Sequence, residues 1–191
     1  MPLEEYQRKR NFKKTTEPAP GPIKKREKKL SYLIQKHDAT RLHYDFRLEL
    51  DGVLLSWAVT KGPSLNPADK RLAVRTEDHP LDYGSFEGTI PKGEYGGGTV
   101  MLWDTGTWEP IDDPHAGMEN GHLSFVLHGK RLKGKWNLIR MRGEGKRENW
   151  LLIKDNDDEA RTKSNEEFLE DLAFSVTTER SMDEIAAGKR R

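Results

Sequence analysis

The sequence lacks several features on which whole classes of function depend. None of its 191 residues is a cysteine, which excludes disulfide bonds, thiolate zinc sites and a cysteine nucleophile. No apolar run approaches the roughly 18 residues of a membrane-spanning helix. No apolar stretch follows the charged N-terminus, as it would in a secretory signal. The Gly-x-Ser-x-Gly motif of many serine hydrolases is also missing. We therefore expect a protein of the reducing cytoplasm.

Hydrophobic residues are scarce and the charges are unevenly distributed. Hydrophobic and charged residues each make up 34% of the chain. Residues 1–30 hold ten Lys or Arg against four Glu, an excess of +6, and residues 155–171 hold eight acids against two bases. Because Pro18, Pro20 and Pro22 interrupt the first stretch, we expect a flexible basic arm and linker there. Such an arm suits a polyanionic partner, although a solvated leader has the same composition.

Alternating residues predict β-strands from residue 31 onward. In residues 42–50, Leu, Tyr, Phe and Leu side chains occupy one face, and His43, Asp45, Arg47 and Glu49 occupy the other. Asp51-Gly52 is typical of a two-residue hairpin turn, after which residues 53–59 return as an apolar strand. Further strands are predicted at 32–37, 71–77, 98–103, 123–128, 135–141 and 149–154.

Many short strands separated by glycine-rich turns indicate a mainly β protein. The predicted fold is a small antiparallel β-barrel with short flanking helices and a flexible basic N-terminal arm. Ser164 and Ser181 each precede a Glu by three residues, the spacing of a helix capping box. We therefore divide the chain into an arm (1–30), a barrel (31–157) and a C-terminal helical extension (158–191). The five tryptophans are more typical of a barrel core than of base stacking.

The polar face of strand 42–50 is the strongest local indication of chemistry. Residues two apart on a strand point the same way, so His43, Asp45 and Arg47 share one surface. Imidazole and carboxylate suit a divalent metal such as manganese, and guanidinium suits phosphate. The alternative is an ordinary solvent-facing strand with a cross-strand ion pair. His37, near the end of the preceding strand, is a candidate third ligand.

Other residues of the central region add to this picture. His79 precedes a proline that keeps its backbone extended, and Tyr83 follows four residues later. Lys61, Arg71 and Arg75 supply further cations, so a phosphate-binding ring is possible, although each residue alone suits an ordinary surface. The glycine-rich segment 93–98 lacks the lysine of a phosphate-binding loop and is interpreted as a turn. His115, His122 and His128 have no ligand spacing and are interpreted as structural.

One long series of motifs resembles the 3′-phosphoesterase domain of bacterial DNA ligase D. The resemblance covers roughly residues 3–155. It comprises segment 35–49 (Gln-Lys-His-Asp-Ala-Thr-Arg-Leu-His-Tyr-Asp-Phe-Arg-Leu-Glu), Ser56-Trp57-Ala58-Val59, Lys61-Gly62-Pro63-Ser64, Glu77-Asp78-His79-Pro80 and segment 83–91. The N-terminal segment is similar too, with Leu3-Glu4-Glu5-Tyr6, Lys9-Arg10-Asn11-Phe12 and Thr16-Glu17-Pro18.

The resemblance implies a manganese-dependent enzyme that repairs DNA 3′ ends in end joining. Such an enzyme removes a terminal ribonucleoside to leave a 3′-phosphate, and then removes the phosphate to leave a 3′-hydroxyl. Other divalent transition metals remain possible. The implied metal ligands are His37, His43 and Asp45. The implied phosphate-binding or catalytic residues are Arg47, Lys61, Arg71, His79 and Tyr83, with Gln35 and Glu77 in support.

The same resemblance assigns Arg10, Asn11 and Glu17 mainly to the ribonucleoside-removing step. Asn11 departs from the family, which usually has aspartate there, so we expect this step to be the weaker one. Either His79 or the Tyr83 hydroxyl is a candidate proton donor. We also expect the arm to matter more for DNA than for small phosphate esters.

The implied substrates are primer-template 3′ ends that carry a ribonucleotide or a phosphate, and the implied partners are DNA ligase, polymerase and Ku. A cytoplasmic, nucleoid-associated location follows. The chain has no convincing adenylation motif, so it is a free-standing enzyme or a domain of a larger ligase. Two alternatives stay open: a catalytically weak barrel that binds nucleic-acid ends for a ligase, and a metal-dependent esterase of small phosphorylated metabolites.

Overall fold

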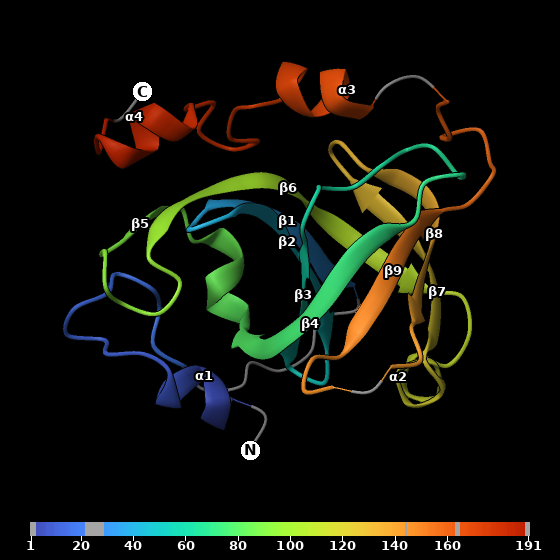
Figure 1. Cartoon of the computed structure of the whole chain (residues 1–191), viewed down its shortest axis with the longest axis horizontal. Coiled ribbons are helices and arrows are strands. Elements are labelled where there is room, and N and C mark those ends of the chain that lie inside the picture. The colour runs from blue at the N-terminus through green and yellow to red at the C-terminus, as the bar shows by residue number, and fades with distance from the viewer. Residues whose placement is uncertain (1–2, 22–28, 144, 163–164, 190–191) are drawn as a thin grey trace.

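The computed structural model describes residues 3–21, 29–143, 145–162 and 165–189. Figure 1 shows a strongly curved sheet with short helices around it. The strands are β1 (Leu30–Asp38), β2 (Leu42–Leu50), β3 (Val53–Val59), β4 (Arg71–Pro80), β5 (Gly88–Ile90), β6 (Gly98–Pro110), β7 (His122–Gly129), β8 (Lys133–Arg140) and β9 (Asn149–Lys154). The helices are α1 (Glu4–Arg8), the 3-10 helix η1 (Leu81–Ser85), α2 (Pro114–Asn120), α3 (Asn165–Asp171) and α4 (Met182–Ala186).

The strands form a closed antiparallel barrel, which confirms the predicted fold class. The hydrogen-bonded order is β1-β2-β3-β4-β9-β8-β7-β6-β5, and β1 also pairs with β6. That extra pairing closes a ring of eight strands, and the short β5 extends the sheet beside β6. The predicted β2–β3 hairpin is confirmed. Asp51 and Gly52 both have positive φ, 54° and 81°, as a type I′ turn requires.

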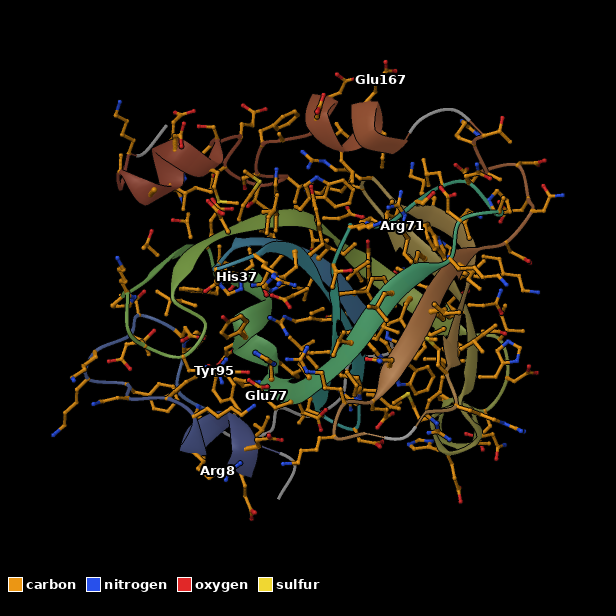
Figure 2. All side chains as sticks on the ribbon, in the orientation of Figure 1. Arg8, His37, Arg71, Glu77, Tyr95 and Glu167 are labelled. Atoms are coloured by element: carbon orange, nitrogen blue, oxygen red, sulfur yellow. The ribbon has the colours of Figure 1, made fainter. Side chains whose placement is uncertain are left out.

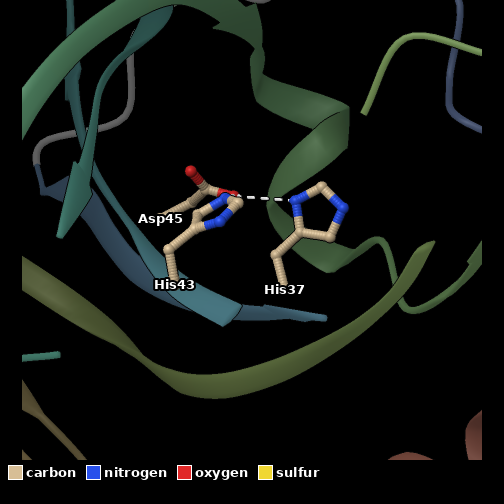
Figure 3. Close-up of side chains that lie close together, drawn as sticks. All are labelled: His37, His43 and Asp45. Atoms are coloured by element: carbon tan, nitrogen blue, oxygen red, sulfur yellow. Dashed lines mark ion pairs between the residues drawn. The ribbon is translucent and has the colours of Figure 1, made fainter. Parts of the chain in front are cut away.

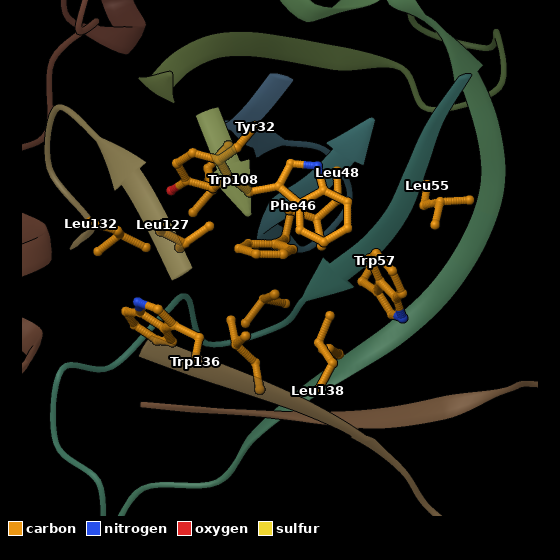
Figure 4. Close-up of a cluster of buried hydrophobic side chains, with 14 of the residues drawn as sticks. Tyr32, Phe46, Leu48, Leu55, Trp57, Trp108, Leu127, Leu132, Trp136 and Leu138 are labelled. Carbon is orange, nitrogen blue, oxygen red and sulfur yellow. The ribbon is translucent and has the colours of Figure 1, made fainter. Parts of the chain in front are cut away.

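The barrel core contains the apolar face of β2 and all five tryptophans. Phe46, Leu48, Trp57, Trp108 and Trp136 are among its almost fully buried side chains, and Figure 4 shows several of them packed together. This confirms the interpretation of the tryptophans as core residues. Because the core takes one face of each strand, the polar face of β2 lies on the outer side of the barrel wall.

A second hydrophobic cluster covers part of that outer face. It joins Tyr6 to Leu33, Leu54, Tyr83 and Leu102. Residues 3–21 therefore differ from the flexible arm expected from composition. The Tyr6 side chain is fully buried, and its hydroxyl donates to the carbonyl of Pro18. The charge explains the difference, because residues 3–21 hold five bases and three acids, an excess of only +2.

The C-terminal residues pack against both hydrophobic clusters, through Ile185 in the first and Val176 on the second. The Trp103 indole donates to the Leu172 carbonyl, and Glu87 accepts hydrogen bonds from Thr178 and Arg180. The predicted capping box at Ser181 is present at the start of α4, whereas Ser164 lies outside the described residues. Among the described residues, no helix has the length and apolar character needed to cross a membrane.

Candidate metal and phosphate site

A pocket of about 960 Å³ opens on the outer face of β1–β4. The N-terminal segment, the β1–β2 turn, the β5–β6 loop and the β8–β9 loop contribute to its walls. Its lining holds seven Lys or Arg against four Asp or Glu, so the pocket favours anions. The seven cations are Lys9, Arg10, Arg41, Arg47, Arg75, Lys146 and Arg147, and the four acids are Glu5, Asp45, Glu77 and Glu148.

Strand register brings the three predicted metal ligands together. His37 on β1 is paired directly with His43 on β2, and Asp45 lies two residues beyond His43 on the same face. The Asp45 Oδ2 atom is 3.4 Å from His37 Nδ1 and 3.3 Å from His43 Nε2, as Figure 3 shows. One ligand atom from each residue lies within 4.8 Å of the others.

Each imidazole is oriented by a backbone carbonyl. His37 Nε2 lies 2.7 Å from the Gly96 carbonyl, and His43 Nδ1 lies 2.9 Å from the Arg41 carbonyl. A carbonyl only accepts hydrogen bonds, so these ring nitrogens carry the protons. In the neutral rings, the other nitrogens therefore present lone pairs toward Asp45. Metal-binding histidines in proteins are usually held in this way.

The donor set fits a divalent transition metal. Ligand bonds of about 2.0–2.2 Å place neighbouring ligand atoms roughly 3.0–3.5 Å apart, which is close to the separations around Asp45. Two imidazoles and one carboxylate accept manganese, iron, cobalt or zinc, and without sulfur they do not select a soft metal. His37, His43 and Asp45 would each give one ligand atom to such an ion.

Asp45 is held in its charged form. Burial opposes its ionisation, but the nearby Arg47 guanidinium, and hydrogen bonds from His37 and His43 whenever their facing nitrogens are also protonated, outweigh burial and keep the pKa of Asp45 well below its ordinary value. Arg47 Nη2 is 3.6 Å from Asp45 Oδ2. A carboxylate is thus available to a cation without first losing a proton.

Arg47 is fixed from several directions. Its Nε donates to Gln35 Oε1 at 2.8 Å, and its Nη1 donates to Ser56 Oγ at 2.7 Å. Gln35 is itself fully buried and donates to the carbonyls of Tyr83 and Phe86. Arg47 therefore sits beside the three ligands with a rigid orientation, as a group that holds a planar anion must.

His79 lies next to Arg47 in a buried, cationic environment. Its Nδ1 is 2.9 Å from the Glu77 carbonyl and carries the proton, while Nε2 accepts from Arg10 Nη2 at 3.2 Å. Burial and the positive charges of Arg47 and Arg10 hold the pKa of His79 well below its ordinary value. His79 is therefore neutral at physiological pH.

The N-terminal segment completes this side of the pocket. Arg10 forms ion pairs with Glu17 at 2.8 Å and with Glu77 at 3.1 Å, and all three side chains are at most 5% exposed. The ring of Tyr6 packs edge-on against His79, with 5.1 Å between centroids. Two of the three predicted N-terminal residues, Arg10 and Glu17, thus lie in the site although they precede the barrel in sequence.

Tyr83 is brought to the same cluster by η1. Its ring lies 4.7 Å from that of His79, and the Arg47 guanidinium lies over it at 4.9 Å. Burial, together with Glu17, raises the pKa of Tyr83 well above its ordinary value. Its hydroxyl therefore keeps its proton throughout the physiological range and serves as a hydrogen-bond donor.

Five predicted residues do not line the pocket. Gln35 and Glu17 contact the lining residues Arg47 and Arg10, and the other three are Lys61, Arg71 and Asn11. Arg71, at the start of β4, does not line the pocket, and its Nη2 atom lies 3.8 Å from Asp69 Oδ2. Figure 2 shows Arg71 at the other end of β4 from Glu77. Lys61 is exposed and does not line the pocket.

Asn11 is also exposed and lies outside the lining. Its Oδ1 accepts the backbone N–H of Lys13, which stabilises the turn after α1. The roles proposed for Lys61, Arg71 and Asn11 in phosphate chemistry therefore remain predictions without support from their positions.

Several pocket residues escaped the sequence analysis. Tyr6, Ser56 and Tyr95 make close contacts in the site, and Arg41, Lys146 and Arg147 line its rim. Ser56 faces Arg47 across the β2–β3 ladder, so the predicted hairpin register alone contained a signal for it. The others lie on loops or on the N-terminal segment, where no periodicity fixes their direction.

The fold and site define a β-barrel protein with a buried His-His-Asp cluster beside a fixed arginine. Residues 35–140 match the family of the DNA ligase D 3′-phosphoesterase domain. The chain belongs to this family.

Full-length relatives support the assignment. The chain is 56% identical over 182 residues to the multifunctional non-homologous end joining protein LigD of Pseudomonas aeruginosa, a match that covers 95% of this chain and 22% of that protein. It is 48% identical over 145 residues to the Mycobacterium tuberculosis LigD, covering 74% of this chain and 19% of that protein. It is 39% identical over 193 residues to the Mycolicibacterium smegmatis LigD, a match that covers 97% of this chain and 24% of that protein. The chain thus spans about a fifth to a quarter of these relatives.

Proposed function

We propose that the protein is a metal-dependent DNA 3′-end-healing phosphoesterase that acts in double-strand break repair by end joining. It would remove a 3′-terminal ribonucleoside as a phosphodiesterase and a 3′-phosphate as a phosphomonoesterase, with Mn²⁺ as the metal. The observation that carries the proposal is the cluster of His37, His43 and Asp45. Its free donor atoms converge beside Arg47, and both imidazoles are held by backbone carbonyls.

Each group in the pocket has a role in this chemistry. His37, His43 and Asp45 would hold the ion, which supplies Lewis-acid stabilisation of the negative charge on phosphate oxygens. Arg47 binds the scissile phosphate, with Gln35 and Ser56 fixing its guanidinium. Arg10 is a second cation near the phosphate site, and its guanidinium donates to the Nε2 atom of His79. These preorganised cations stabilise charge that grows in the transition state.

His79 and Tyr83 act as hydrogen-bonding groups rather than proton donors. The single proton of neutral His79 faces the Glu77 carbonyl, so it is not directed at the substrate. The raised pKa of Tyr83 makes its hydroxyl a poor acid, because efficient acids have a pKa near the working pH. We infer that they orient Arg10, Arg47 and the phosphate, and that water protonates the departing oxygen.

Ribonucleoside removal forms a bond from a water oxygen to phosphorus and breaks the bond from phosphorus to the O5′ atom of the terminal ribonucleoside. Phosphate removal likewise forms a bond from a water oxygen to phosphorus, breaks the bond from phosphorus to O3′ of the strand and releases inorganic phosphate. The relatives are non-homologous end joining proteins by name. We propose by analogy that this chain works with ligase and polymerase activities and with Ku. A cytoplasmic, nucleoid-associated location is part of the same proposal.

A labelled primer-template ending in one ribonucleotide tests the proposal. With Mn²⁺, we expect conversion to a 3′-phosphate and then to a 3′-hydroxyl, and with chelator we expect neither. The two other candidate functions give different results. A barrel that only binds ends would retain the primer without hydrolysing it. An esterase of small metabolites would hydrolyse a nucleoside 3′-monophosphate faster than the primer.

A further inference from the structure

Tyr95 in the β5–β6 loop is an exposed aromatic side chain in a pocket whose other tyrosine is buried. It is 45% exposed, whereas Tyr83 is 2% exposed. Tyr95 belongs to neither hydrophobic cluster among the described residues. Its exposure is therefore not explained by a role in packing the barrel. Large exposed aromatic groups in anion-binding pockets are typical of surfaces on which nucleobases stack.

The Tyr95 ring is fixed in place although it is exposed. Its hydroxyl lies 3.3 Å from Lys9 Nζ and 3.4 Å from Glu77 Oε2. The Lys9 ammonium lies 4.7 Å from the ring centroid, and the Arg10 guanidinium lies 5.3 Å from it. A ring held in this way loses little conformational entropy when a flat ligand stacks on it.

Tyr95 is also connected to the proposed metal ligands, through the residue that follows it in the sequence. The next residue, Gly96, accepts the hydrogen bond from His37 Nε2 at 2.7 Å. On its other side, Tyr95 contacts Glu77, which pairs with Arg10. Figure 2 shows Tyr95 and Glu77 near each other beside α1. A group attached to a phosphate at the three ligands would meet this tyrosine at the wall made by the N-terminal segment.

Three further cations line the pocket besides Lys9, Arg10, Arg47 and Arg75. Arg41 lies in the β1–β2 turn, and Lys146 and Arg147 lie in the β8–β9 loop. All three are exposed, and no ion pair holds any of them within the part of the chain that the structure describes. Unpaired surface cations attract the phosphates of a strand. The β8–β9 loop, which carries Lys146 and Arg147, stands apart from the β5–β6 loop in Figure 1, whereas the β1–β2 turn packs against Gly98 at the start of β6.

We propose that Tyr95 is the stacking platform for the base of the terminal nucleoside, the one esterified through its 5′ oxygen to the scissile phosphate. The polynucleotide strand then approaches over Arg41, Lys146 and Arg147. This inference rests on the proposed phosphoesterase function and adds a nucleobase subsite to it. A 3′-phosphate end has no nucleoside beyond the phosphate, so Tyr95 contributes to ribonucleoside removal far more than to phosphate removal.

Kinetics on three primer ends test the subsite. The primers end in a riboadenosine, in an abasic ribose or in a 3′-phosphate, all with Mn²⁺. Base stacking on an aromatic side chain typically contributes roughly a 5- to 150-fold effect. We expect Tyr95→Ala to lower kcat/KM for the riboadenosine end at least ten-fold more than for the 3′-phosphate end. The preference of the unchanged protein for riboadenosine over the abasic end should disappear in this variant.

Two further variants separate stacking from other effects. Tyr95→Phe keeps the ring but loses the hydroxyl contacts with Lys9 and Glu77, and should retain the base preference. Tyr95→Leu fills similar space without an aromatic face and should lose it. Phe174→Ala is the matched control, because Phe174 is an exposed aromatic residue outside the pocket and its loss should leave all three rates unchanged.

Binding without catalysis provides a second measurement. A primer with a terminal 2-aminopurine ribonucleotide, titrated with protein in chelator, should lose fluorescence with the unchanged protein and with Tyr95→Phe, but much less with Tyr95→Ala. Equal losses of rate on the riboadenosine and 3′-phosphate ends, or a base preference that survives in Tyr95→Ala, would overturn the subsite and leave the phosphoesterase intact. Absence of manganese-dependent hydrolysis at every end would overturn the proposed function itself.

Discussion

The β1–β2 hairpin and the N-terminal segment supply opposite sides of one pocket but are held in different ways. The hairpin carries His37, His43 and Asp45 on a continuous ladder of paired residues inside the closed barrel. The N-terminal segment has no strand, and its α1 helix has five residues. It is attached mainly through the buried side chains of Tyr6 and Arg10.

Because of this difference, we expect binding of the ion to be independent of the docking of residues 3–21, which closes one side of the pocket. The hairpin positions its ligands through backbone hydrogen bonds that persist whether or not residues 3–21 are docked. The segment depends on a few side-chain contacts, so one substitution can release it. We therefore expect metal affinity to depend on the hairpin and hardly on residues 3–21, while the rate depends on both regions.

The largest expected effect comes from the hairpin. Asp45→Asn keeps the shape of the side chain but removes the charge that both imidazoles face. Changes to outer groups around a metal typically cost 10- to 100-fold in affinity or activity, so loss of a ligand should cost at least about 100-fold in both. His37→Ala and His43→Ala should act similarly. Titration calorimetry with Mn²⁺ measures the affinity, and thermal unfolding checks that the barrel persists. Undiminished manganese affinity in Asp45→Asn would remove Asp45 from the ligand set.

The N-terminal segment should show the complementary behaviour. Arg10→Ala leaves the buried carboxylates of Glu17 and Glu77 without their shared partner, a situation that typically costs about 3–5 kcal/mol. We expect the segment to undock, hydrolysis to slow by roughly 100-fold, as for other misplaced catalytic groups, and Mn²⁺ affinity to stay within about two-fold.

Arg8→Ala on the same helix is the control, because Arg8 is 77% exposed, and it should change nothing. The loss in Arg10→Ala should extend to a small aryl phosphate ester, because Arg10 contacts His79 rather than distant DNA. A loss confined to primer-template would restore the original interpretation of an arm that only binds DNA.

The same contrast explains which features the sequence could predict. Alternation and a two-residue turn are local, so they predicted the β2–β3 hairpin, the common face of His43 and Asp45, and the barrel that their strands build. These local patterns did not decide whether the polar face of β2 was exposed to solvent. In the structure it is buried from Tyr44 to Leu50 on both sides, because residues far away in the chain cover it.

The contacts that cover it could not be read from periodicity. Tyr6 and Arg10 meet His79 across about seventy residues of chain, and no local pattern encodes such a pairing. Composition predicted a flexible basic arm over residues 1–30, but the charge excess of that stretch lies mostly after residue 21. The family resemblance pointed to Arg10 and Glu17, but it also named Lys61 and Arg71, which do not line the pocket.

The attachment of the segment should depend on pH through Glu77. Burial opposes ionisation of Glu77, but a backbone hydrogen bond and the charges of Arg10 and Lys9 lower its pKa below the ordinary 4.5. A carboxyl whose folded pKa is lowered stabilises the docked state above pH 4.5, and this contribution is lost as pH falls through the folded pKa. Tyr95 also faces this carboxylate, through its neutral hydroxyl.

We therefore expect faster hydrogen exchange at the amides of Lys14 and Thr15, which donate to the Asn11 carbonyl, as the pH falls below 4.5 and through the lowered pKa of Glu77. Rates are corrected for intrinsic exchange and compared with amides of the β1–β2 ladder, which should stay protected. Glu77→Gln should release the N-terminal segment at pH 7 while the β1–β2 ladder stays protected. Tryptic cleavage after Lys13 or Lys14 reports the release. Equal deprotection of the ladder would show that segment and barrel unfold together.

The smallest expected effect is that of Asn11→Asp, which tests how far the segment reaches toward substrate. The family usually has aspartate at this position, so the carboxylate should speed ribonucleoside removal more than phosphate removal. However, the Asn11 side chain is exposed, lies outside the pocket lining and accepts the Lys13 N–H, a bond that aspartate can also accept. Exposed substitutions of this kind usually change free energies by less than about 0.5 kcal/mol, which corresponds to roughly two-fold in rate. We expect ribonucleoside removal to rise by no more than that, with phosphate removal unchanged, in time courses on gels that resolve all three ends. A ten-fold gain would show that residue 11 turns toward the scissile phosphate when DNA binds, so that the segment is rearranged by substrate while the hairpin is not.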